Sequence, residues 1–232
     1  MYKFTVIFIL FTMFHSLQAK EFSYGHDTRQ KLDYFEKKGV EKVLFFVHGG
    51  AWIVGDKRSS LHKKRELDMG LITINYSLNT SIENQVKDTY AAYKKAKSLI
   101  GPNKKLILSG HSAGAQLVLM AFLKYNLKED IIVVDTSYNY MKKKGSLYTA
   151  WNGYSKERRA ALSPELNLRK TNSKILIIAS KKNKKDSKIF FKKLKKFAPN
   201  AKLLQTKYSH GKVNKIIGDK KHKSYYNTFN LF

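Results

Sequence analysis

Short apolar runs, each about the length of one β-strand, recur along this chain and alternate with segments of helical spacing. The apolar runs occupy residues 42–47, 71–76, 106–109, 131–134, 174–179 and 201–206. The helical segments occupy residues 82–100, 115–125 and 189–197. A run that is apolar at successive positions predicts a strand buried on both faces, which is typical of parallel sheets. Alternation with helices then predicts an α/β fold: a doubly wound, mostly parallel sheet with helices on both faces.

The first 19 residues have the layout of a secretory signal peptide. Lys3 supplies a positive charge, residues 4–14 form an apolar run, and Ala19 is the small residue expected before a cleavage site. This run is too short to cross a bilayer comfortably, since a spanning helix takes about 20 residues. We therefore expect residues 1–19 to be removed and the protein to be exported, either periplasmic or secreted. An uncleaved leader that anchors the protein in a membrane is the alternative.

The remainder, residues 20–232, is expected to form a single domain. The chain holds only three Pro and has no linker-like stretch to divide it. Its length suffices for one substantial core. Residues 135–167 are rich in aromatic side chains and are expected to cap the cleft at the end of the sheet.

The formal net charge is +28, and the excess is concentrated late in the chain. Residues 169–232 hold nineteen Lys or Arg and two acids. Such a field attracts polyanions, so an anionic envelope or membrane surface is an expected partner of the Lys-rich C-terminal third. The alternative is that lysine is simply the default solvated residue. No motif indicates a specific nucleic-acid partner, and the absence of Cys excludes thiol catalysis and zinc–thiolate sites.

The segment Gly110-His111-Ser112-Ala113-Gly114 joins an apolar strand to an apolar helix. A serine on so sharp a turn is held in a strained backbone conformation that projects its hydroxyl from the sheet, and the flanking positions must be small for the turn to close. The start of the following helix directs the N–H of Ala113 toward a developing oxyanion. This pattern predicts that Ser112 is a nucleophile.

A second loop of small residues, HGGAW at residues 48–52, also follows a strand directly. Consecutive small residues let backbone N–H groups face a cleft, where they can stabilise the negative oxygen of a tetrahedral intermediate. His48 is expected to hold this loop rather than to act as the base. Trp52 and His111, one from each motif, are assigned to substrate binding.

His210 follows the last predicted strand and is the expected general base, because the nucleophile, the acid and the histidine then occur in that order along the chain. The acid that orients it is expected after the strand at 174–179, where Asp186 is the carboxylate. Asn183 lies nearer that strand and is the alternative. An acid from elsewhere, such as Asp135 after the strand at 131–134, is the remaining possibility.

Together these motifs resemble the α/β-hydrolase family, in the carboxylesterase branch close to feruloyl-esterase-like and kynurenine-formamidase-like proteins, which shares features with hormone-sensitive-lipase relatives. The resemblance spans about residues 43–211. It rests on HGGAW at 48–52, on NYSL at 75–78, which is similar to the family's NYRL, and on GHSAG at 110–114. Asn183 departs from the family, which usually has Asp at this place.

The resemblance implies a serine hydrolase that acts on carboxylic esters through an acyl-enzyme, with Gly50, Ala51 and Ala113 supplying the oxyanion N–H groups. It implies a small-molecule ester as the substrate, and no metal or organic cofactor. Two other functions stay open. One is an amidase of the formamidase kind, which would use the same residues. The other is a weak or inactive cationic binding protein on this scaffold, which Asn183 and the net charge suggest.

Overall fold

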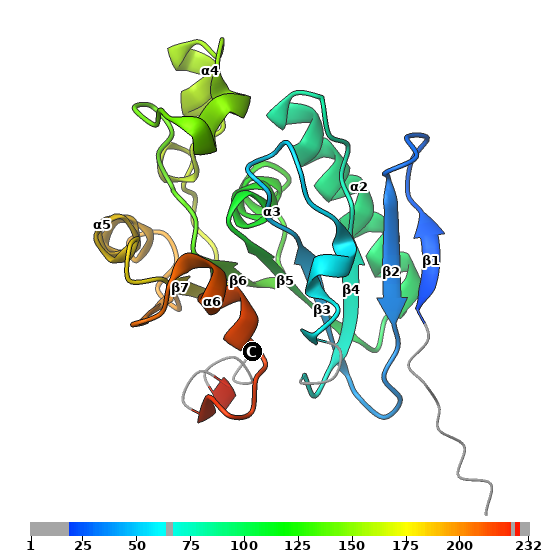
Figure 1. Cartoon of the computed structure of the whole chain (residues 1–232). Helices are drawn as coiled ribbons and strands as arrows, with labels where there is room; N and C mark the ends of the chain where they lie inside the picture. Colours follow the sequence, from blue (N-terminus) through cyan, green and yellow to red (C-terminus); the bar gives the residue numbers. More distant parts are fainter. Residues whose placement is uncertain (1–18, 64–66, 224–225, 228–232) are drawn as a thin grey trace, which may run out of the picture.

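The computed structural model describes residues 19–63, 67–223 and 226–227, so the predicted leader lies almost entirely outside the described residues. These residues form an eight-stranded sheet with the strand order β1-β2-β4-β3-β5-β6-β7-β8 (Figure 1). The strands are β1 (Lys20–Ser23), β2 (Lys31–Phe35), β3 (Lys42–Val47), β4 (Gly70–Ile74), β5 (Lys105–His111), β6 (Asp130–Val134), β7 (Ile175–Ala179) and β8 (Lys202–Gln205).

Strands β3 to β8 are parallel, while β2 pairs antiparallel with both β1 and β4. The central strands are buried almost throughout, which explains why they read as uninterrupted apolar runs. The predicted doubly wound, mostly parallel sheet is therefore confirmed. The hairpin of β1 and β2 was not predicted, because its short, half-polar strands carry no such run.

The helices cover both faces of the sheet. The longer ones are α2 (Ile82–Ile100), α3 (Ala113–Lys124), α5 (Lys184–Leu194) and α6 (His210–Ile216). Side chains of α2, α3 and α5 pack into the larger apolar cluster on one face, and those of α6 pack into a second cluster on the other (Figure 1). Helix α5 lies against β7 and β8, at the opposite edge of the sheet from β1. No helix of the described part is long and apolar enough to cross a membrane.

Residues 135–167, which we call the cap segment after the sequence prediction, carry the short helices η2 (Ser146–Trp151), α4 (Lys156–Ala161) and η3 (Pro164–Leu166) and project from the body of the molecule (Figure 1). Several of its aromatic side chains pack onto one another and onto the body. The Tyr140 and Trp151 rings stack with centroids 4.2 Å apart, and the Trp151 ring meets the Trp52 ring edge-on at 5.3 Å. The cap is thus fixed to the loop that follows β3.

Candidate active site

Ser112 occupies the junction between β5 and α3 with φ 56° and ψ −122°, a strained conformation for a residue with a side chain. The flanking glycines make this turn possible. A Cβ on Gly110 would lie 2.4 Å from the carbonyl oxygen of Gly114, and a Cβ on Gly114 would lie 2.3 Å from that of His48. The structure therefore has the sharp turn that the sequence predicts at Ser112.

Replacing Gly114 with Ala is expected to lower the free energy of unfolding by about 2–3 kcal/mol, because the new methyl group would collide with the backbone of β3 and its following loop. Gly211 offers a matched control, since a Cβ there would meet nothing within 4 Å and Ala favours the helix by up to about 1 kcal/mol. Urea unfolding of the two variants would measure the difference. Equal stability of Gly114→Ala and Gly211→Ala would contradict this account of the turn.

His210 is the first residue of α6, which packs on the face of the sheet opposite to α3. The Ser112 hydroxyl donates to His210 Nε2, with Oγ and Nε2 3.0 Å apart. The His210 side chain is 46% exposed, so solvent and small molecules have access to this pair. The distance and the exposure suit proton transfer between a nucleophile and a base.

The carboxylate that contacts His210 within the described residues belongs to Asp135, directly after β6. His210 Nδ1–H donates to Asp135 Oδ2 at 2.6 Å, and the Ser180 N–H donates to Oδ1 at 2.6 Å. Asp135 is fully buried. Burial raises the pKa of this carboxyl, but the hydrogen bonds from His210 and Ser180 outweigh it, so the pKa lies below its ordinary value. Because a carboxylate only accepts hydrogen bonds, it fixes the proton of neutral His210 on Nδ1 and leaves Nε2 free to accept.

This arrangement corrects the expected position of the acid. Asp186 lies on α5 and pairs with Lys143 of the cap segment at 2.7 Å, while Asn183 is the N-cap residue directly before α5. Since α5 starts at Lys184 rather than at 189, the loop after β7 comprises residues 180–183, which hold no carboxylate. Parallel strands end at the same edge of a sheet, so the neighbouring β6 supplies the carboxylate instead. In the sequence, the feature that points to Asp135 is its position directly after the strand that becomes β6.

The loop after β3 lies against the serine turn. A Cβ on Gly49 would be 3.1 Å from Ser112 Cβ, so a larger residue at this position would crowd the serine turn. Gly50, Ala51 and Trp52 all have positive φ values, of 130°, 50° and 66°. Within the described residues, the N–H groups of Gly50, Ala51 and Ala113 donate to no protein acceptor. The resemblance implies these three N–H groups as oxyanion donors.

Two buried glutamines hold this strained loop in place. Gln85 Nε2 donates to the Trp52 carbonyl at 2.7 Å. Gln116, on α3 one turn after Ser112, accepts from the Trp52 indole N–H at 3.0 Å and donates to the Leu162 carbonyl of the cap at 3.0 Å. Gln116 therefore joins the nucleophile helix, the loop and the cap through one side chain.

Trp52 and His111, the two residues assigned to substrate binding, use their side chains for internal contacts. Trp52 is 5% exposed, and its indole N–H donates to Gln116 Oε1. His111 Nε2 lies 3.1 Å from the His210 carbonyl, and burial lowers its pKa to about 3, so the ring is neutral. His48 is buried too, with a pKa lowered to about 4; its Nδ1 lies 2.6 Å from the Gly49 carbonyl and its ring stacks on Tyr76. These three residues shape the site without facing the solvent.

Comparison with known proteins places this geometry in a family. The family model BD-FAE matches residues 32–150, which include the loop after β3, the serine turn and Asp135. The chain belongs to the BD-FAE family of α/β-hydrolase esterases. The BD-FAE family is a family of hydrolases, so the chain belongs to a hydrolase family.

Relatives of this BD-FAE chain include a curated protein from Oryza sativa subsp. japonica, described as a probable isoprenylcysteine alpha-carbonyl methylesterase. It is 26% identical over 133 residues, which cover 52% of this chain and 31% of that protein. The match therefore spans about a third of the length of that relative.

Solved structures with the same fold include carboxyl esterase 2 from the fungus Tuber melanosporum (TM-score 0.71, 16% identity, covering 92% of this chain and 84% of that one). A hyperthermophilic esterase from the archaeon Pyrobaculum calidifontis has a TM-score of 0.73 and 13% identity, covering 91% and 83% of the two chains. At such identities the likeness shows a shared fold alone.

Proposed function

We propose that this protein hydrolyses small carboxylic esters through an acyl-enzyme on Ser112. The observation that carries the proposal is the hydrogen-bonded series from Ser112 Oγ through His210 to the buried Asp135. As Ser112 Oγ attacks the ester carbonyl carbon, His210 Nε2 takes its proton. Asp135 stabilises the imidazolium that forms, and its lowered pKa keeps it ionised as it does so.

The N–H groups of Gly50, Ala51 and Ala113 would receive the oxygen that becomes negative in the tetrahedral intermediate. When the ester C–O bond breaks, His210 returns its proton to the leaving alkoxide, and the acyl group stays on Ser112. Water then attacks the acyl carbon while His210 Nε2 accepts its proton. As the Ser112–acyl bond breaks, His210 passes this proton to Ser112 Oγ, so the acid is released and the serine hydroxyl is restored.

A direct test measures turnover of p-nitrophenyl acetate and butyrate, of matched anilides and of formylated arylamines, together with labelling by a fluorophosphonate probe. We expect labelling at Ser112 and faster turnover of the esters. Faster turnover of the amides would favour the amidase alternative. The absence of both labelling and turnover would favour a binding protein and overturn the proposal.

We also propose that the protein is exported by its leader. The first described strand, β1, begins at Lys20, directly after the expected cleavage position at Ala19, so removal of residues 1–19 would leave every described strand intact. Expression of the full-length chain in a secreting host and intact-mass measurement should give a product that starts at Lys20. A membrane-bound product that retains residues 1–19 would instead support the anchored alternative.

A further inference from the structure

Helix α5 presents a row of lysines to solvent. Its inner positions, Ser187, Phe190 and Leu194, are buried against the sheet. Lys185, Lys188 and Lys192 are exposed and follow one another at three- and four-residue spacing, which places them along one side of the helix. Four further exposed lysines lie just before and after the helix: Lys181, Lys182, Lys195 and Lys196. We call these seven residues the lysine row.

The nearby acids are already engaged with other cations. Asp186, the acid of α5, pairs with Lys143 at 2.7 Å. Glu165 of η3 pairs with Lys193, with Nζ and Oε1 2.5 Å apart. In the described part of the chain, no member of the lysine row has an ion-pair partner. The row thus keeps its full positive charge for an external partner.

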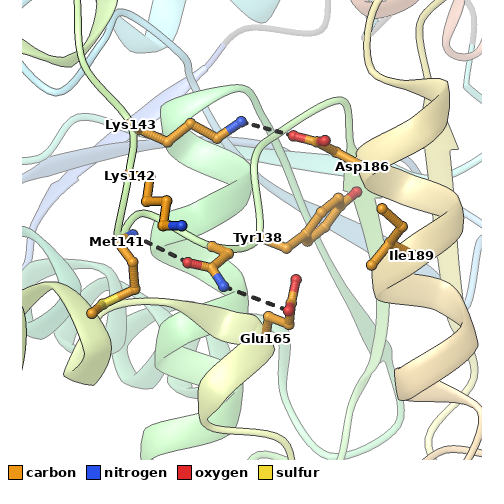
Figure 2. A pocket seen from close by; sticks show the side chains of 8 residues that line it. Tyr138, Met141, Lys142, Lys143, Glu165, Asp186 and Ile189 are labelled. Carbon is orange, nitrogen blue, oxygen red and sulfur yellow. Dashed lines mark hydrogen bonds and ion pairs between the residues drawn. The ribbon is translucent and has the colours of Figure 1, made fainter.

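An apolar residue interrupts the cationic surface beside the row. Ile189 is 47% exposed and lines a pocket of about 440 Å³ between α5 and the cap segment. Figure 2 shows Ile189 on α5 facing this pocket, with Met141 and Lys142 of the cap on the opposite wall. Lys142 is exposed and has no ion-pair partner among the described residues. Basic side chains around an exposed aliphatic one suit the interface of a bilayer, where phosphate headgroups meet the acyl region.

The composition of the same segment argues against nucleic acid as the partner. Residues 181–196 contain no Arg, Tyr or Trp, and Phe190 and Phe191 are packed against the core. Binding to single strands uses exposed aromatic platforms, and base recognition in duplexes relies chiefly on forked Arg and amide side chains. A row of lysines with an aliphatic neighbour offers point charges and apolar contact, which is what a lipid surface needs.

We propose that the lysine row and Ile189 dock this protein on the surface of anionic phospholipid bilayers. This surface is separate from Ser112 and His210, so the proposal stands independently of the hydrolysis proposed above. The Lys143–Asp186 pair links the docking helix to the cap, which places the cap beside the bilayer when the protein is docked. The proposal thus assigns seven of the nineteen basic residues of the C-terminal segment to one binding surface.

Co-sedimentation of the full chain with vesicles tests the proposal. We expect binding to phosphatidylcholine vesicles containing 30% phosphatidylglycerol, weaker binding in 0.5 M salt, and little binding to phosphatidylcholine alone. Replacing Lys185, Lys188 and Lys192 with Gln should lower the partition coefficient about 10- to 100-fold, since each basic residue near an anionic surface contributes up to about fivefold. Ile189→Ser should lower it several-fold.

A matched triple variant supplies the control. Lys38, Lys87 and Lys94 are exposed lysines away from α5, so their replacement with Gln removes the same charge from another part of the surface. This variant should bind within about twofold of the wild type, and all variants share the same leader. Equal losses in the two triple variants, or no preference for anionic vesicles, would overturn the proposal. Binding to a DNA duplex but not to vesicles at the same salt would also overturn it.

Discussion

Replacing Ser112 with Ala is expected to lower kcat/KM for p-nitrophenyl butyrate by at least about 10⁴-fold, because no other group in the described site can form the acyl-enzyme. The fold should survive, since among the described residues the Ser112 side chain makes one hydrogen bond, to His210. Ala also keeps the small size that the crowded contact with Gly49 requires. Rates and far-UV circular dichroism of the purified variant would test both statements.

A fluorophosphonate probe should label the wild type and leave Ser112→Ala unlabelled. Ser98→Ala is a suitable control, because Ser98 is exposed on α2 and its hydroxyl donates to the Lys95 carbonyl of the same helix. That variant should keep the wild-type rate. Activity within tenfold of the wild type in Ser112→Ala would show that another residue carries the reaction.

The turn at Ser112 and the position of His210 could be read from the sequence because local chemistry dictates them. Only small residues close the turn at Gly110 and Gly114, and only a strand followed by a helix gives that turn its direction. His210 stands at the start of the helix that follows the last strand, which brings it to the edge of the sheet where the serine lies. Each residue is thus tied to the end of an element that its neighbours already predict.

The acid could not be read in the same way because two neighbouring strands end at the same place. Both β6 and β7 reach the edge where His210 lies, and the choice between them depends on where α5 begins. Ser180, at the end of β7, still takes part, since its N–H binds the Asp135 carboxylate. The burial of Trp52 and His111 could not be predicted from the sequence either. Trp52 is covered by Gln116 and by Trp151 of the cap segment, and His111 by α6, all of which are distant in the sequence.

Replacing Asp135 with Asn is expected to lower kcat about 10³- to 10⁴-fold without unfolding the protein. The amide oxygen can still accept from the Ser180 N–H, as Oδ1 does in the wild type at 2.6 Å. The amide NH₂ would then face His210 Nδ1 as a donor. The ring must therefore accept at Nδ1 and carry its proton on Nε2, which leaves Nε2 unable to take the Ser112 proton.

Asp186→Asn is the matched control, because it makes the same chemical change at the carboxylate that the sequence predicts as the acid partner of His210. It loses only the partly exposed pair with Lys143, which is worth at most about 1 kcal/mol of stability. Its kcat and that of Asn183→Ala should stay within about twofold of the wild type. A large loss in either control, with Asp135→Asn near the wild-type rate, would place the acid after β7 instead.

Combining Asp135→Asn with Ser112→Ala distinguishes a carboxylate that acts through the histidine from one that merely supports the fold. If Asp135 acts only by orienting and stabilising His210, it has nothing to contribute once the nucleophile is absent. The double variant should then be as slow as Ser112→Ala alone, since residues that work as a unit are not additive. A structural role would lower the residual rate of the double variant, or its unfolding midpoint in urea, further than Ser112→Ala does.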